Sequence, residues 1–282
     1  MNIITTSIIL NIARVVNKIG LITIAAFLML VCGCRHSTIS NIGQKDTNTI
    51  PDLPPVSVVI FGMERSKAGN CPGSELDARR FQQLMNKLGY GGSTKMFLNE
   101  AGTIYNFQTE VEKAVMSDLA IIYYSGHGGS DESHRFGTGE NEDDGIDEFL
   151  CLYDGYYLDD DIWNIVSKSK GRVLMIFDCC HSKTMFRSPP MGEFAELMYA
   201  RADGQKEQFS LLCWSGCPDN TYSYGSNEGG FFTSTMLKYW RPGMTYNQLW
   251  RLVSVDANLS KAQICQQTQA GGEWDFNREA FR

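Results

Sequence analysis

Short apolar segments alternate with segments of helical periodicity along most of the chain. Five segments rich in β-branched and aromatic side chains are predicted to be buried strands: residues 56–61, 95–98, 119–124, 172–177 and 209–214. Five others carry apolar residues at three- and four-residue spacing and are predicted to be helices: residues 74–88, 103–116, 158–166, 231–240 and 246–259. We expect Ser74 to cap the first helix and Gly89 to end it. The alternation indicates an α/β fold with a largely parallel sheet, covered on both faces.

Two of the predicted strands are followed by residues with side chains suited to catalysis. Ser125-Gly-His127-Gly-Gly129 follows the strand 119–124, and Asp178-Cys-Cys180-His-Ser182 follows the strand 172–177. In parallel sheets, ligands bind beyond the carboxyl ends of the strands. A histidine close to a cysteine favours the thiolate and makes it a nucleophile. Either motif alone is more typical of a glycine turn or of buried thiols, whereas the two together predict a catalytic pair.

The first 55 residues are predicted to direct export. Arg14 and Lys18 precede an apolar run over residues 21–31, which is too short for a spanning helix and is typical of a signal peptide. Val-Cys-Gly-Cys34 resembles a bacterial lipobox, so we expect residues 1–33 to be removed and Cys34 to carry lipid. An ordinary signal, or a short signal-anchor with incidental cysteines, is the alternative. Residues 34–55 are polar and predict a flexible tether.

The amino-acid composition excludes a disordered protein and argues against nucleic-acid binding and a structural zinc site. The 282 residues are 43% hydrophobic, which excludes a disordered protein. There are 25 basic and 32 acidic residues, a formal charge of -7, so the basic surface that nucleic acids require is absent. Removal of the signal would leave a charge of -9. The 9 cysteines show neither CxxC nor zinc-ligand spacing, so we expect no structural zinc site.

The two motifs together resemble a known family. Tyr123-Tyr-Ser-Gly-His-Gly-Gly129 and Phe177-Asp-Cys-Cys-His-Ser182 look like the catalytic signature of the caspase-like cysteine peptidases, closest to the metacaspases and their bacterial relatives. Further similar segments lie in the same order along residues 56–240: Cys71–Ala78, Asp143–Asp154, Leu158–Ile162 and Phe209–Tyr239. The resemblance implies a caspase-like α/β/α sandwich with a mostly parallel central sheet, spanning residues 56–282.

The resemblance also assigns catalytic roles. His127 is the general acid and base, and Cys180 is the nucleophile. The backbone N–H groups of Gly128 and Cys180 are the oxyanion donors. Cys179 is expected to point into the packing and His181 to be structural, because adjacent side chains diverge. The implied reaction is peptide hydrolysis through a thioester acyl-enzyme, and it requires no cofactor.

The resemblance further implies a preference for basic substrate residues. Cys71 stands where caspases hold an aspartate substrate with an arginine, whereas Asp77 and Asp178 match metacaspase residues that line a pocket for arginine or lysine. We therefore expect cleavage after Arg or Lys. The alternative is that Asp77 caps its helix and Asp178 braces the nucleophile turn. Trp214 is expected to form a wall for the neighbouring substrate residue, with a core position as the alternative.

Acidic clusters favour calcium as an activator. They are Asp143–Asp144, Asp147–Glu148 and Asp159–Asp161. Hard oxygen ligands suit Ca²⁺, and metacaspases are typically calcium-activated. No EF-hand spacing is present, and Asp159 and Asp160 match the family's metal-binding pair best. A solvated acidic loop beside a helix N-terminus is the alternative.

One departure from the family pattern concerns the residues after the nucleophile. Lys183 replaces the usual glycine and could narrow the cleft, and residues 183–208 are typical of an intersubunit linker that the enzyme could cut itself. We expect a monomeric cysteine endopeptidase, exported in a bacterium, that acts on protein or peptide substrates and contacts the membrane only through lipid. A scaffold that has lost turnover and a thiol hydrolase of non-peptide amides are the alternatives.

Overall fold

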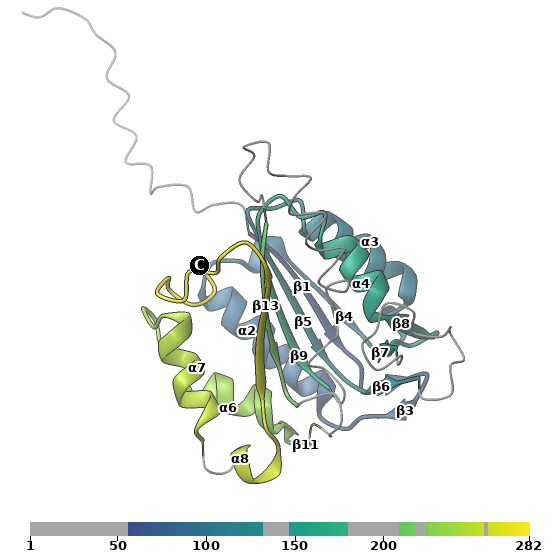
Figure 1. Ribbon diagram of the computed structural model, residues 1–282. Coiled ribbons are helices and arrows are strands. Elements are labelled where there is room, and N and C mark those ends of the chain that lie inside the picture. Colours follow the sequence, from purple (N-terminus) through teal and green to yellow (C-terminus); the bar gives the residue numbers. More distant parts are fainter. Residues whose placement is uncertain (1–55, 132–146, 180–208, 218–222, 224, 257–258) are drawn as a thin grey trace, which may run out of the picture. The chain divides into compact units, whose positions relative to one another are not determined.

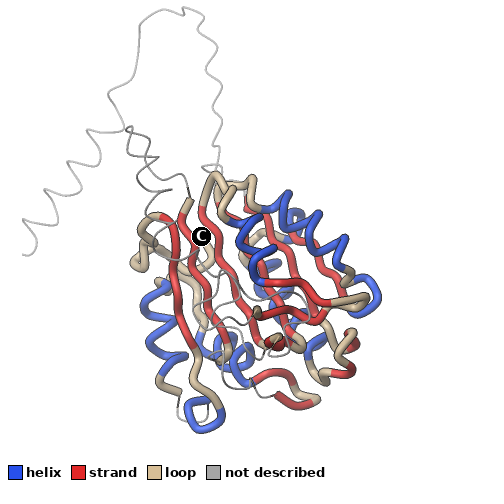
Figure 2. The backbone as a smooth tube through the Cα atoms, turned by 45° about the vertical axis from the view of Figure 1, so that its right-hand side comes forward, coloured by secondary structure: helices blue, strands red, loops and turns tan. Residues whose placement is uncertain are grey.

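The computed structural model describes residues 56–131, 147–179, 209–217, 223, 225–256 and 259–282, all within one compact unit. Their centre is a six-stranded sheet with the order β13-β10-β9-β5-β1-β4 (Figures 1 and 2). The strands are β1 (Val56–Gly62), β4 (Thr94–Leu98), β5 (Leu119–Ser125), β9 (Arg172–Asp178), β10 (Ser210–Ser215) and β13 (Gln266–Gly271). The predicted signal peptide, the tether and the linker 183–208 lie outside the described residues.

Five of these strands confirm the predictions, and they pair in parallel. The sixth, β13, pairs antiparallel with β10 and was not predicted. Its sequence, Gln-Gln-Thr-Gln-Ala-Gly, is polar and does not alternate with apolar residues, so it carries no strand pattern. Because β13 lies at the edge of the sheet and is never fully buried, it does not need such a pattern.

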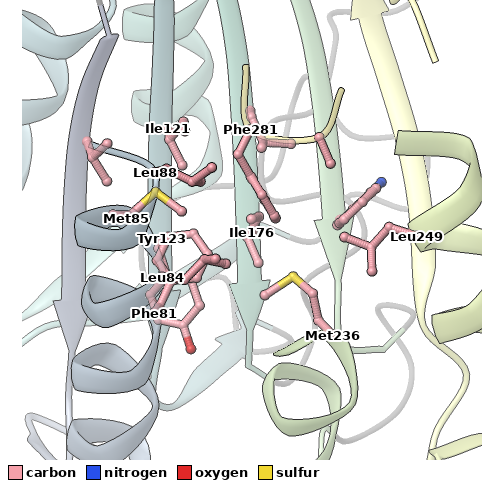
Figure 3. Close-up of a cluster of buried hydrophobic side chains, with 14 of the residues drawn as sticks. Phe81, Leu84, Met85, Leu88, Ile121, Tyr123, Ile176, Met236, Leu249 and Phe281 are labelled. Atoms are coloured by element: carbon pink, nitrogen blue, oxygen red, sulfur yellow. The ribbon is translucent and has the colours of Figure 1, made fainter. Parts of the chain in front are cut away.

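Helices cover both faces of the sheet, as predicted. Val58 and Ile60 of β1 pack into a cluster with α2, α6 and α7, whereas Val59 and Phe61 pack into a second cluster with α3 and α4. Figure 3 shows part of the first cluster, in which Phe81 of α2 lies against the sheet. The helices are α2 (Ser74–Lys87), α3 (Ile104–Ala114), α4 (Asp159–Val166), α6 (Phe231–Tyr239) and α7 (Tyr246–Ser254). The fold is therefore an α/β/α sandwich.

The start of α2 and the end of α7 differ from the predictions because of contacts with other segments. Gly73, with φ 92°, is the N-cap of α2, and Ser74 is its first helical residue rather than its cap. A side chain at Gly73 would collide with the backbone of Ser226 at 2.2 Å, so tertiary contact decides this position. Helix α7 ends at Ser254, because the Asp256 carboxylate accepts the backbone N–H of Leu259 and begins the separate turn α8 (Leu259–Ala262).

Short strands surround the carboxyl end of the sheet. They form the hairpin β2 (Arg65–Ser66) and β3 (Gly69–Asn70), the hairpin β11 (Gly225–Ser226) and β12 (Gly229–Gly230), and a three-stranded sheet of β6 (Gly128–Ser130), β7 (Glu148–Cys151) and β8 (Tyr156–Leu158). They are too short to show a pattern in the sequence. Among the described helices, none has both the length and the apolar character to cross a bilayer.

Candidate active site

The ends of β5 and β9 lie side by side and bring the two motifs together. Ser125 is paired with Asp178 in the parallel ladder, and the Gly126 N–H donates to the Asp178 carbonyl at 3.3 Å. His127 therefore follows β5 at the same edge of the sheet where Cys179 follows β9. This confirms that the two strand ends share one edge. Cys180, the predicted nucleophile, lies outside the described residues.

The backbone fixes both the position of His127 and the tautomer of its ring. Its Nε2 lies 2.9 Å from the carbonyl oxygen of Asn70. Since a carbonyl can only accept, Nε2 carries the proton, and Nδ1 is the nitrogen that can take a proton from a thiol. The His127 carbonyl accepts from the Tyr124 hydroxyl at 2.7 Å and from the Cys151 N–H at 3.0 Å. Hydrogen bonds thus fix both the imidazole ring and the backbone carbonyl of His127.

The β6–β7 ladder leaves unused the N–H of Gly128, which is predicted to bind the oxyanion. The bond from Cys151 to His127 makes those two residues a hydrogen-bonded pair of the β6–β7 ladder. In antiparallel ladders such pairs alternate with non-hydrogen-bonded ones, so Gly128 and Leu150 form a non-hydrogen-bonded pair. The ladder therefore does not consume the Gly128 N–H, as its predicted role requires.

Asp77 and Asp178 line one pocket beside His127. Both oxygens of Asp178 accept hydrogen bonds, Oδ1 from the Ser223 hydroxyl at 2.6 Å and Oδ2 from the Thr233 N–H at 2.9 Å. Asp77 Oδ2 accepts from the Gly230 N–H at 2.7 Å and from the Ser125 hydroxyl at 3.2 Å. Asp77 Oδ1 is buried and has no hydrogen-bond partner among the described residues.

Burial disfavours the charged forms of the two pocket carboxylates. Burial, and then the charge of Asp178, raise the pKa of Asp77 to about 7. Burial also raises the pKa of Asp178, against the hydrogen bonds from Ser223 and Thr233. Cys71 lines the same pocket, and burial raises the pKa of its thiol. The positive charge of Arg80 lowers the pKa of Asp77, but burial and Asp178 outweigh it.

Glycines of the β11–β12 hairpin let the backbone reach these carboxylates. A Cβ on Gly230 would lie 2.2 Å from Asp178 Oδ2, and a Cβ on Gly229 would lie 2.2 Å from Asp77 Oδ1. Sequence reasoning missed Ser125, Ser223 and Gly230 as pocket residues. The adjacent pair Gly229-Gly230 before a predicted helix was the one signal that could have pointed to a close approach.

Trp214 corrects a prediction. It is 0% exposed and packs against Tyr246 and Trp250 in the core, and its indole N–H donates to Gln267. It does not line the pocket beside His127. The core alternative therefore holds, because the Trp214 side chain points from β10 into the layer covered by α7. Cys179 is buried in the opposite cluster, as predicted.

The predicted metal-binding residues lie apart, at the start of α4. Asp159 is 0% exposed, and neither of its side-chain oxygens has a hydrogen-bond partner within the described part of the chain. Burial and the charge of Glu148 raise the pKa of Asp159 to about 9. Because Asp159 is fully buried, the alternative of a solvated acidic loop does not describe it. Asp160 beside it is half-buried. The described residues contain no group of three or more possible ligands.

These features define a class of site: a histidine and an adjacent pair of cysteines that follow neighbouring strands of an α/β/α sandwich, next to an acidic pocket, as in a thiol hydrolase. Residues 57–272 match the family model of the caspase domain. The chain therefore belongs to the caspase-domain family of cysteine peptidases.

Similar proteins agree with this assignment. Metacaspase-1 of Pyricularia oryzae is 38% identical over 86 residues, which are 28% of this chain and 21% of that protein. Metacaspase-1 of Saccharomyces cerevisiae is 30% identical over 127 residues, 39% of this chain and 28% of that protein. The chain thus aligns with less than a third of these relatives. A crystal structure of a Geobacter sulfurreducens protein shares the fold, with a TM-score of 0.61, 23% identity, and coverage of 81% of this chain and 98% of that one.

Proposed function

We propose that the protein is a cysteine endopeptidase that cleaves after arginine or lysine. The observation that carries this proposal is Asp77, a buried carboxylate with one oxygen lacking a partner among the described residues, next to Asp178 in the pocket beside His127. A guanidinium or ammonium group would satisfy that oxygen and offset the charge of both acids. An aspartate substrate would add a third negative charge there.

The proposed mechanism uses the groups at the two strand ends. His127 Nδ1 takes the proton of the Cys180 thiol, and the sulfur attacks the carbonyl carbon after the basic residue. The Gly128 and Cys180 N–H groups bind the oxyanion. The protonated imidazole then donates to the leaving amine, which departs and leaves a thioester. Water, deprotonated by His127, attacks the thioester and releases the acid and the thiol.

Fluorogenic peptides test the proposal. We expect release after Arg and Lys but not after Asp, and loss of about 10³-fold or more in kcat for Cys180→Ala. A panel of peptides that differ only in the residue before the scissile bond measures the preference. Wild-type rates no higher than those of Cys180→Ala across the panel would instead support a scaffold.

We also propose that Ca²⁺ binds near the start of α4. Asp159 supports this, since a buried carboxylate whose oxygens lack described partners fits a hard cation, and Asp160 follows it. The three-stranded sheet supplies a route to the active site: β6 begins directly after His127, and β8 ends directly before Asp159. Bound Ca²⁺ would supply positive charge that holds these acids in place.

The location of the protein is likewise a proposal: an exported lipoprotein anchored through Cys34. The support is the apolar run before Val-Cys-Gly-Cys34. Mass spectrometry of the mature N-terminus tests it. A diacylated Cys34 is expected, and an unmodified chain that retains residues 1–33 would contradict it.

A further inference from the structure

The β2–β3 hairpin carries the carbonyl that orients the catalytic histidine. Asn70, whose oxygen accepts from His127 Nε2, is the last residue of β3. The hairpin has only two residues in each strand. Isolated hairpins are marginally stable in water, so the position of this carbonyl depends on bonds from the rest of the domain.

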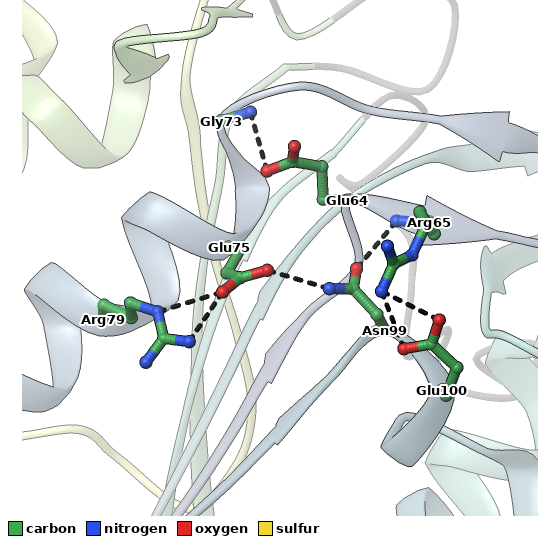
Figure 4. A network of polar contacts seen from close by, with 7 residues as sticks. All are labelled: Glu64, Arg65, Gly73, Glu75, Arg79, Asn99 and Glu100. Atoms are coloured by element: carbon green, nitrogen blue, oxygen red, sulfur yellow. Dashed lines mark hydrogen bonds and ion pairs between the residues drawn. The ribbon is translucent and has the colours of Figure 1, made fainter.

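Asn99 supplies one such bond from a buried position. It is 5% exposed and follows β4 in a left-handed conformation, with φ 49°. Its Oδ1 accepts the backbone N–H of Arg65 at 2.8 Å, and Arg65 is the residue paired with Asn70 across the hairpin. The side chain of Asn99 is therefore bonded to the residue directly opposite the one that holds His127 (Figure 4).

Asn99 is itself fixed by helix α2. Its Nδ2 donates to Glu75 Oε2 at 2.8 Å, and Arg79 binds the other oxygen of Glu75 at 2.6 Å. Figure 4 shows the resulting chain of contacts from α2 through Asn99 to the hairpin. Both polar ends of the Asn99 amide are thus in use, which determines its orientation.

Two further contacts of the β2–β3 hairpin are a backbone hydrogen bond at its tip and an exposed ion pair. The Lys67 N–H donates to the Leu152 carbonyl at 2.8 Å, and this bond holds the tip. The ion pair between Arg65 and Glu100 has side chains 57% and 56% exposed. Exposed pairs contribute little to stability, so this one is a suitable comparison for the buried amide.

We propose that Asn99 is a positioning residue for His127, acting through the β2–β3 hairpin to place the Asn70 carbonyl against Nε2. The inference rests on the proposed function for its link to catalysis. Its effect on the histidine tautomer does not depend on that function. Without the Asn99 side chain, the Asn70 carbonyl is no longer fixed against the His127 ring, so the Nε2–H tautomer is no longer selected.

The left-handed backbone conformation of Asn99 allows a substitution that removes the side chain without straining the backbone. Asparagine tolerates this conformation better than most residues, and glycine adopts it freely. Asn99→Gly therefore removes both side-chain bonds without backbone strain. Asn99→Asp retains an acceptor for the Arg65 N–H but sets two carboxylates together at Glu75. Adding Glu75→Gln restores a donor–acceptor pair with reversed polarity, so the double variant is the rescue.

The tautomer is measured directly by ¹⁵N NMR of the histidine rings, with the His127 signals assigned by loss in His127→Ala. We expect a single Nε2–H form in the wild type and a mixture in Asn99→Gly. In the peptide assay, we expect kcat to fall by about 10- to 100-fold, with a much smaller change in KM. The double variant Asn99→Asp/Glu75→Gln should recover both properties, and Glu100→Gln should match the wild type. Thermal unfolding confirms that each variant is folded.

A folded Asn99→Gly variant with the wild-type tautomer would overturn the inference, as would a double variant no better than Asn99→Asp alone. Failure of the proposed function looks different. In that case the wild type lacks peptidase activity, while the tautomer still changes in Asn99→Gly.

Discussion

Asp77 and Asp178 occupy the same pocket but are hydrogen-bonded differently. Both oxygens of Asp178 accept bonds from Ser223 and Thr233, whereas Oδ1 of Asp77 has no partner among the described residues. Such a carboxylate costs stability when it is charged, because its hydration is lost without full replacement. Under the proposed function, a basic substrate side chain that enters the pocket would remove this cost.

Asp77→Asn should lose cleavage after Arg and gain stability at high pH. The pKa of Asp77 in the folded protein is about 7, above the ordinary aspartate value of 3.8, so its charged form destabilises the native state. The penalty is full above about pH 7 and disappears as pH falls towards 4. We expect Tm of the variant to exceed that of the wild type at pH 8 by roughly 2–4 °C per kcal/mol relieved, and the two to converge near pH 4.

The same titration predicts the pH dependence of specificity. For the wild type, kcat/KM with an Arg peptide should rise through pH 7 relative to a peptide with a neutral residue, since Asp77 gains its charge there. In Asp77→Asn this ratio should stay flat. An unchanged preference for Arg over Asp peptides in the variant would exclude Asp77 from the pocket's function.

At the scale of elements, the β11–β12 hairpin shapes the pocket through its backbone. Gly230 is also the N-cap of α6, with φ -71° and ψ 145°, a conformation open to any residue. Its lack of a side chain therefore reflects the nearby Asp178 carboxylate rather than backbone strain. The hairpin can approach both acids only because Gly229 and Gly230 carry no Cβ.

Gly230→Ala should displace Asp178 and weaken binding of basic substrates. The new Cβ would lie 2.2 Å from Oδ2, which requires the carboxylate or the hairpin to move. We expect KM for an Arg peptide to rise by about 10-fold or more, as a misplaced charge partner implies. Gly92→Ala is the matched control, because a Cβ there meets nothing within 4 Å. Equal KM values in the two variants would contradict this role of the hairpin.

At the scale of the whole molecule, the small sheet β6-β7-β8 joins the active site to the acidic start of α4. Its first strand follows His127, and Asp159 follows its last strand. A cation bound by Asp159, as proposed, would stabilise the folded domain, because the unfolded chain does not assemble the site.

Ca²⁺ should therefore raise the Tm of the wild type. At a hundredfold excess over Kd the stabilisation is about 2.7 kcal/mol, roughly 5–10 °C for a domain of this size. EGTA should reverse the shift. Asp159→Asn should abolish it, while Asp161→Asn, a change of an exposed acid in the same turn, should retain it. An equal shift in wild type and Asp159→Asn would place Ca²⁺ elsewhere.

Local patterns in the sequence determined much of the fold. The apolar runs of β1, β5, β9 and β10 are buried on both sides, so their strands could be predicted without knowing their neighbours. The same reasoning located His127 and Cys179, because carboxyl ends of parallel strands meet at one edge. Asp77 and Asp178 were predicted from the family resemblance, and the structure places both in one pocket.

Tertiary structure alone decided the features that depend on distant segments. The core position of Trp214 depends on α7 packing over β10, and the cap at Gly73 depends on the backbone of Ser226. The contact between the Asn70 carbonyl and His127 joins residues 57 positions apart, through a hairpin too short to leave a periodic pattern. Periodicity reports which face of an element is buried, whereas hydrogen bonds between short irregular segments leave no trace in composition or spacing.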